Sequence, residues 1–255
     1  MIAHLSDLHF GRHDPPAAAT LADDVAAAGP DVVVVTGDST TRARNAEFAQ
    51  ARAFLDGLVA PLLVVCGNHD VPLFGVGRLV APYDRYRAWL DVDLEPRLDL
   101  PGIRALGLQS MPRWRWKNGR VSARQSALVG TYLGAAPTGA VRLLALHHPP
   151  FVRGPARIAG RGALLRAVAA AGVDLVLAGH THVPASRRLD LAPGHRLVEV
   201  VAGTATSLRL RGAPRSWTVI RVDAGHIHVE ARVEVDGCWR GGPAVSHPRA
   251  APGTH

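Results

Sequence analysis

Five apolar runs in this sequence are each followed by carboxylate, amide or imidazole side chains. The side chains that follow the runs are Asp7 and His9, then Asp38, then Asn68, His69 and Asp70, then His147 and His148, and finally His180 and His182. Their oxygen and nitrogen atoms suit borderline-to-hard divalent metal ions, and the absence of thiolates disfavours a cysteine-type structural zinc site. The pattern indicates a metal centre that uses oxygen and nitrogen ligands.

The apolar runs have the length and composition of buried strands. In an open α/β sheet, ligands gather beyond the carboxyl ends of the strands, so residues that follow several strands can meet there. A strand also places residues two apart on one face, which would pair Asp7 with His9 and His180 with His182. The runs lie at residues 2–5, 32–35, 62–66, 143–146 and 175–177.

Each of these polar residues also has an ordinary interpretation. Asp38, Asn68 and Asp70 are common turn residues, and two histidines followed by prolines are typical of a strand end at the surface. These interpretations would have to hold independently at five strand ends on one edge of a sheet. A shared site explains the whole pattern with one cause.

Helical patterns separate the strands in the amino-terminal part of the chain. Helices are expected at residues 15–28 and 45–58, so the first 70 residues read β-α-β-α-β and predict parallel strands. Ser122 and Gln125 have capping-box spacing and predict a helix from there to about residue 133. Further predicted elements are a short helix within 83–90, strands at 103–108, 141–146 and 173–177, and a helix at 162–171.

The pattern changes after His182. Strands are expected at residues 197–202, 217–222 and 226–235, and they fit a second, β-rich sheet with a hairpin turn at 223–225. Residues 237–255 are rich in glycine, proline and alanine without periodicity, so they are expected to form a disordered tail. The catalytic domain is therefore predicted to span residues 1–236.

The charge of the chain does not by itself identify a partner. The formal net charge is +8, and Lys117 is the only lysine, so the positive charge is almost entirely arginine. This composition fits a GC-rich coding bias and a phosphate-bearing substrate better than a dedicated nucleic-acid surface. Two cysteines offer no disulfide framework, and neither a secretory signal nor an apolar run of about 18 residues is visible, so a cytoplasmic location is expected.

These motifs, in this order, resemble those of the calcineurin-like metallophosphoesterases. The matching motifs are Asp7-x-His9, Gly37-Asp38, Gly67-Asn68-His69-Asp70, His147 and Gly179-His180-x-His182. The chain is similar in particular to the bacterial class III cyclic-nucleotide phosphodiesterases, because of the His147-His148-Pro149-Pro150 segment and residues 118–122 before a helix. The resemblance implies an α-β-β-α sandwich of two mixed β-sheets flanked by helices.

The resemblance also implies a role for each residue in a centre of two divalent ions, Mn²⁺ or iron, with Zn²⁺ as a further choice. Asp38 bridges both ions, which suits an anionic ligand. His69 faces the leaving group or a phosphoryl oxygen, and Asp70 orients it. Arg12 either helps to hold the phosphate or is a solvated loop residue. The first ion is bound by Asp7, His9 and His182, and the second by Asn68, His147 and His180.

The implied function is hydrolysis of a small phosphodiester, such as 3',5'-cyclic AMP, through in-line attack of a metal-bridging hydroxide. The alternatives are a pyrophosphatase for a nucleotide-linked lipid (the UDP-2,3-diacylglucosamine type) at the membrane surface, a nuclease, and a non-catalytic interaction module. The basic loop at residues 113–120 carries Trp114 and Trp116, and it could bind substrate, contact a membrane or pack on the neighbouring helix. A small phosphate ester is the expected partner, nucleic acid is disfavoured, and a homodimer is a further alternative.

Overall fold

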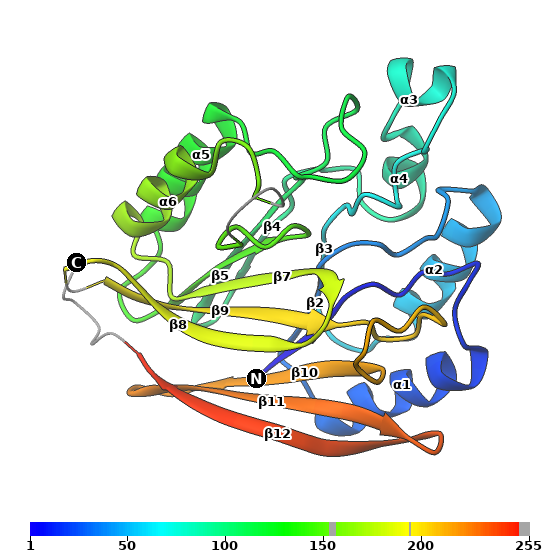
Figure 1. Cartoon of the computed structure of the whole chain (residues 1–255). Coiled ribbons are helices and arrows are strands. Elements are labelled where there is room, and N and C mark those ends of the chain that lie inside the picture. Colours follow the sequence, from blue (N-terminus) through cyan, green and yellow to red (C-terminus); the bar gives the residue numbers. More distant parts are fainter. Residues whose placement is uncertain (153–156, 194, 250–255) are drawn as a thin grey trace.

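Two six-stranded mixed β-sheets pack face to face in the computed structural model, and helices cover their outer faces (Figure 1). The structure describes residues 1–152, 157–193 and 195–249. This architecture confirms the α/β sandwich of two mixed sheets.

The first sheet combines strands from both ends of the chain. Its order is β12-β11-β10-β1-β2-β3; β1, β2 and β3 are parallel, and β10 pairs with β1 in the antiparallel sense. Helices α1 (Pro15–Ala28) and α2 (Asn45–Asp56) belong to this half. The strands are β1 (Ile2–Leu5), β2 (Val32–Val35), β3 (Leu62–Val64), β10 (Ser216–Val222), β11 (His226–Val235) and β12 (Cys238–Pro248).

The second sheet has parallel central strands and antiparallel strands at both edges. Its order is β4-β5-β6-β7-β9-β8. Two helices belong to this half: α5 (Ala123–Leu128), which continues as a π-helical turn over Val129–Leu133, and α6 (Arg161–Ala170). The short helices α3 (Val76–Val80) and α4 (Asp84–Trp89) come before this sheet in the sequence. The strands are β4 (Arg97–Leu100), β5 (Ile103–Leu108), β6 (Val141–Leu146), β7 (Leu175–His182), β8 (Ala185–Ala192) and β9 (His195–Gly203).

Successive side chains of the central strands pack alternately into two hydrophobic clusters, one on each face of the sheet. In β2, Val32 and Val34 belong to the cluster between the two sheets, whereas Val33 and Val35 belong to the cluster that contains the apolar residues of α1 and α2. A strand covered on both faces needs apolar residues at every position, which explains the uninterrupted valine run. This double burial holds the carboxyl ends of the strands in fixed positions.

The carboxyl-terminal strands differ from the sequence-based expectation. They do not build a separate sheet, because β10 and β11 extend the first sheet and β9 joins the second beside β7. The hairpin turn between β10 and β11 forms as predicted, with the Asp223 carboxylate accepting from the backbone N–H groups of Gly225 and His226. Periodicity identified the strands, but strand patterns do not say which neighbour each strand pairs with.

The predicted disordered tail is wrong over Cys238–Pro248, which form β12 at the edge of the first sheet. An edge position tolerates glycine and proline, and a register shift opposite Glu230 and Arg232 accommodates the irregular segment. Trp239 anchors the strand, because its buried ring joins the cluster with α1 and its indole N–H donates to the Thr20 hydroxyl at 3.1 Å. Residues 250–255 of the predicted tail lie outside the described residues.

We expect Trp239→Ala to lower the free energy of unfolding by about 3 kcal/mol, since it leaves a cavity between β12 and α1. Trp114→Ala is the control, because Trp114 is 58 % exposed. Urea denaturation followed by circular dichroism measures both variants. Equal stability of the two variants would show that β12 does not contribute to the core.

Candidate functional site

Residues that follow five strands meet at one edge of the two packed sheets. Asp7 and His9 follow β1, Asp38 follows β2, and Asn68 and His69 follow β3 in the first sheet. The second sheet contributes three more side chains, which are His147 after β6 and His180 and His182 at the end of β7. The structure thus brings together every metal-ligand candidate that the sequence indicated.

Five residues at these strand ends, including the last residue of β7, have backbones in the left-handed region. The φ angles are +54° at Asp7, +52° at His9, +53° at Asp38, +71° at His180 and +63° at His182. The sequence analysis assumed that strand alternation places Asp7 with His9, and His180 with His182, on one face. The left-handed backbone shows that these pairs come together in another way. Non-glycine residues in this region carry strain of about 1–3 kcal/mol each and concentrate at functional sites.

Asp7, His9 and His182 form one group of ligand atoms. The Asp7 Oδ1 atom lies 3.1 Å from Nε2 of His182 and 3.7 Å from Nε2 of His9, and these two nitrogens are 3.3 Å apart. Asp7 Oδ1 is buried and has no hydrogen-bond partner among the described residues. A buried carboxylate oxygen that faces two imidazole nitrogens is a suitable place for a cation.

Asn68, His147 and His180 form a second group. The Asn68 Oδ1 atom lies 3.1 Å from Nε2 of His147 and 3.0 Å from Nδ1 of His180, and the two nitrogens are 3.3 Å apart. An amide oxygen and two imidazoles give a neutral set of three ligand atoms. These three atoms lie close enough together to hold one divalent ion.

The Asp38 carboxylate lies between the two groups. Its Oδ2 atom is 3.3 Å from Nε2 of His147 in the second group and 3.8 Å from Nε2 of His9 in the first. Its Oδ1 atom accepts the backbone N–H of His69 at 2.8 Å, which fixes the orientation of the carboxylate. From this position the carboxylate could contribute an oxygen to an ion held by either group.

Hydrogen bonds from the far side of two rings fix their tautomers. Nδ1 of His147 donates to the Thr36 carbonyl at 2.7 Å, and Nδ1 of His182 donates to the Arg209 carbonyl at 3.1 Å. Because a carbonyl oxygen only accepts, Nδ1 carries the proton in each ring. In the neutral rings, the Nε2 lone pairs therefore face the site, as metal ligation requires.

The electrostatics of the site favour positive charge. Burial lowers the pKa of His147, but the Asp38 and Asp7 carboxylates and the Thr36 carbonyl together outweigh burial and raise that pKa to about 9. For His180, burial and the charge of His147 lower the pKa to about 4, which keeps this ring neutral. A place that attracts a proton beside a carboxylate also attracts a metal cation, so the donor set fits a dinuclear centre.

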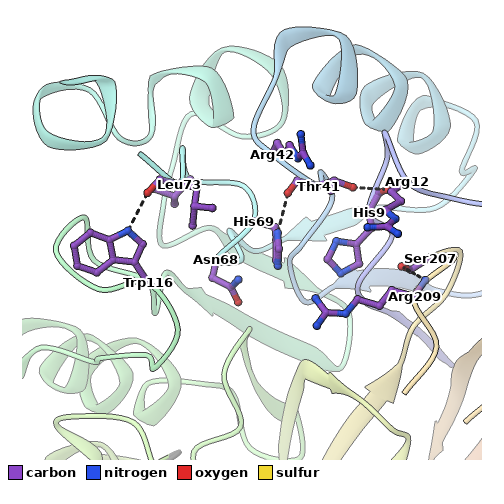
Figure 2. A pocket seen from close by; sticks show the side chains of 11 residues that line it. His9, Arg12, Thr41, Arg42, Asn68, His69, Leu73, Trp116, Ser207 and Arg209 are labelled. Atoms are coloured by element: carbon purple, nitrogen blue, oxygen red, sulfur yellow. Dashed lines mark hydrogen bonds between the residues drawn. The ribbon is translucent and has the colours of Figure 1, made fainter. Parts of the chain in front are cut away.

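His69 lines the cavity beside the ligand groups, but the role expected for Asp70 is wrong. The His69 ring donates from Nδ1 to the Thr41 carbonyl at 2.8 Å, drawn as a dashed line in Figure 2. Asp70 instead accepts from the backbone N–H of Thr40 at 2.8 Å and of Gly67 at 2.9 Å. Asp70 therefore connects the loop after β3 to the loop after β2. The orientation of the His69 ring is fixed by the Thr41 carbonyl instead.

His148 is a neighbour of the second group with a separate role. Its Nε2 donates to the Lys117 carbonyl at 2.9 Å, and its Nδ1 accepts from the Ser110 hydroxyl at 2.8 Å. With both nitrogens engaged, the ring has no free lone pair for an ion, which favours His147 as the ligand. His148 instead holds the loop of Trp116 against the site, a contact that sequence spacing did not reveal.

A cavity of about 250 Å³ opens beside the ligand groups (Figure 2). Its wall includes Arg12, as the sequence suggested, and also Arg42 and Arg209, which sequence analysis missed. Among the described residues, no acidic side chain lines this cavity, so it favours an anion. Trp116 forms another part of the wall, and its indole N–H donates to the Leu73 carbonyl at 2.9 Å. Arg209 lies far along the chain from every strand-end motif, so no local signal pointed to it.

The sequence model of the calcineurin-like phosphoesterase family matches residues 1–184. A probable cyclic nucleotide phosphodiesterase of Synechococcus sp. is 26% identical over 258 residues, which cover 94% of this chain and 89% of that protein. A probable cyclic nucleotide phosphodiesterase of Rhodococcus erythropolis is 28% identical over 218 residues, which cover 71% of this chain and 64% of that protein.

Solved structures of low sequence identity share the fold. Purple acid phosphatase from yellow lupin seeds has a TM-score of 0.70 at 13% identity, over 96% of this chain and 53% of the lupin chain, so this chain spans about half of that enzyme. A variant of Vps29 from Entamoeba histolytica has a TM-score of 0.53 at 13% identity, over 96% of this chain and 98% of the Vps29 chain.

We expect Gly67→Ala to weaken metal binding about 10-fold or more, because the new Cβ would lie 2.2 Å from both the backbone nitrogen and Oδ1 of Asp38. Titration with Mn²⁺, followed by measurement of the bound metal, tests this. Gly130→Ala is the control, since nothing lies within 4 Å of its added Cβ. Normal metal affinity in Gly67→Ala would contradict a centre built around Asp38.

Proposed function

Because the chain belongs to the calcineurin-like phosphoesterase family, we propose that it hydrolyses a small phosphodiester, with a 3',5'-cyclic nucleotide as the first substrate to test. The observation that carries this proposal is the position of the Asp38 carboxylate between two groups of oxygen and nitrogen ligands. Two relatives are named probable cyclic nucleotide phosphodiesterases, which supports this choice of substrate.

The two groups of side chains would hold two divalent ions, with Mn²⁺ and iron as first choices and Zn²⁺ as a further one. Bound ions supply Lewis acidity toward a phosphoryl group and lower the pKa of water. Asp7, His9 and His182 would hold one ion, Asp38 would serve both, and the buried carboxylates would balance part of the positive charge. The second ion would be held by Asn68, His147 and His180.

Other side chains bind the substrate and move the proton. The Oδ1 atom of Asn68 faces the nitrogens of His147 and His180, so its NH₂ group can donate to a phosphate oxygen. The His69 ring is held at Nδ1 by Thr41 and presents Nε2 to the cavity. As an imidazolium, His69 can give its Nε2 proton to the departing alkoxide. The Arg12 guanidinium at the cavity wall can bind a phosphate oxygen.

A cytoplasmic location is part of this proposal. Both cysteines are free thiols, with Cys66 buried and Cys238 exposed, which fits a reducing compartment.

A second candidate is hydrolysis of the pyrophosphate of a nucleotide-linked lipid. Leu73 and Trp116 favour this candidate, because both line the cavity and both are more than half exposed. An apolar rim beside a cationic cavity suits a substrate with a phosphate group and an acyl chain. The chain keeps all the ligand candidates, which disfavours a purely non-catalytic module.

A substrate panel distinguishes these candidates. We expect Mn²⁺-dependent hydrolysis of bis-p-nitrophenyl phosphate, and among natural substrates a higher kcat/KM for 3',5'-cyclic AMP than for a UDP-linked diacylglucosamine, mononucleotides or single-stranded DNA. The opposite order between the first two would favour the lipid pyrophosphatase. A chain that binds Mn²⁺ and hydrolyses none of these compounds would disprove the proposed function.

His69→Ala and Asp38→Ala should separate proton transfer from metal binding. We expect His69→Ala to lower kcat for bis-p-nitrophenyl phosphate about 10²–10⁴-fold with normal metal content, since the ring donates a proton without holding an ion. Asp38→Ala should lose both metal and turnover. Measured metal content and kcat check the pair, and loss of metal in His69→Ala would make His69 a ligand.

A further inference from the structure

Large apolar side chains gather on one exposed surface beside the cavity. They come from α3, from the loop before it, and from the loop that carries the two tryptophans. Half of the strongly exposed large apolar residues of the described chain lie here, so this gathering differs from the scattered exposure of an ordinary surface. We call this surface the α3–Trp patch, and its members are Leu73, Phe74, Val76, Leu79, Val80, Trp114 and Trp116, which are 51 to 76 % exposed.

The α3–Trp patch is fastened from below by Arg78, whose side chain is 2 % exposed. Arg78 donates from Nε to the Arg113 carbonyl at 2.8 Å and from Nη1 to the Pro72 carbonyl at 2.6 Å, and it also bonds the Arg115 carbonyl. Its guanidinium lies 5.3 Å from the centre of the Trp116 ring. These contacts join the segment of α3 to the tryptophan loop. The exposed apolar side chains therefore belong to two segments that are fixed to each other.

Two further hydrogen bonds connect the same two segments. The Trp116 indole donates to the Leu73 carbonyl, and the Arg113 guanidinium donates from Nη1 to the Leu79 carbonyl at 2.8 Å. Figure 1 shows α3 projecting from the body of the molecule, with the loop before α5 beside it. The patch is therefore accessible to a broad, flat partner.

Positive charge predominates in the two segments that build the patch, and an acidic residue beside them is Glu95, which lines a pocket with Arg113 and Trp114. Arg113, Arg115 and Lys117 alternate with the two tryptophans, and Arg120 follows them. Residues 71–83 and 110–124 contain no aspartate or glutamate. The partner that covers this surface must therefore accept apolar side chains and carry negative charge.

A second copy of the chain meets the first requirement but not the second. A two-fold contact places the same surface on both partners, so the cations of each patch would face those of the other. An anionic bilayer meets both requirements, because tryptophan and arginine are favoured at the boundary between headgroups and acyl chains. None of the described helices combines the length and the apolar character that a membrane crossing needs, so the contact is peripheral.

We propose that the α3–Trp patch docks the protein on the surface of an anionic lipid bilayer. Phe74 and Val80 insert among the acyl chains near the headgroups, and the cations beside the tryptophans bind lipid phosphates. Leu73 and Trp116 belong both to the patch and to the wall of the cavity, so docking places the cavity mouth at the bilayer. This inference concerns where the enzyme acts and is independent of the substrate proposed above.

Vesicle co-sedimentation tests the docking. We expect the full chain, loaded with Mn²⁺, to bind phosphatidylcholine vesicles that contain phosphatidylglycerol, and to bind pure phosphatidylcholine about 10-fold more weakly or less. Phe74→Ser/Val80→Ser should weaken binding to the anionic vesicles about 10-fold or more, because the variant removes the apolar anchors. Neither residue lines the cavity, so turnover of bis-p-nitrophenyl phosphate in the absence of vesicles should stay at the wild-type value.

Val59→Ser/Val245→Ser is the matched control. Val59 is 82 % exposed and precedes β3, at the end of that strand away from the site, and Val245 is 46 % exposed on β12. This variant removes two exposed apolar side chains elsewhere and should bind the anionic vesicles as the wild type does.

Three results would overturn the docking proposal. The first is a wild-type chain that does not bind the anionic vesicles, and the second is equal binding by Phe74→Ser/Val80→Ser. The third is a wild-type dimer in light scattering that this variant abolishes while vesicle binding is unchanged, which would assign the patch to a second copy. A failure of bis-p-nitrophenyl phosphate hydrolysis would overturn only the proposed function, since vesicle binding is measured without substrate.

Discussion

The Asp38 carboxylate is the group on which the arrangement of the site depends. It is buried, it faces imidazoles from both sheets, and its backbone is held in the left-handed region after Gly37. Gly67 permits this position because any side chain there would occupy the place of the Asp38 backbone nitrogen and carboxylate. The carboxylate thus links the packing of two sheets to the chemistry at their edge.

The strained strand ends are tied to one another by backbone hydrogen bonds. The N–H of Asp7 donates to the Gly37 carbonyl, and the N–H of His9 donates to the Asp38 carbonyl. Asp70 and Thr40 join the next loop to the same network. The two hydrophobic layers on either side of β2 supply the stability that tolerates this strain. A rigid sandwich therefore holds the ligand atoms close together.

Sequence analysis identified the ligand candidates because each follows an apolar run. Buried parallel strands are easy to recognise in a sequence, since they are apolar at every position. It did not identify the backbone geometry, since the left-handed conformation at Asp7 and His180 comes from contacts with distant loops. It missed β4 and β8, whose exposed edge positions interrupt the apolar pattern. The family resemblance assigned Asp70 to the orientation of His69, whereas its hydrogen bonds run to Thr40 and Gly67. Strand β12 was hidden because one anchor, Trp239, replaces a periodic pattern.

The antiparallel pairing of β1 with β10 has a consequence for the order in which the protein matures. The ribosome delivers Asp7 and His9 early, but β1 lacks one neighbour until residues 216–222 have emerged. His182 must also arrive before the first group of ligands is complete. Long-range pairing of this kind is slow because the chain must first close a large loop. The first group of ligand side chains is consequently complete only after most of the polypeptide has been synthesised.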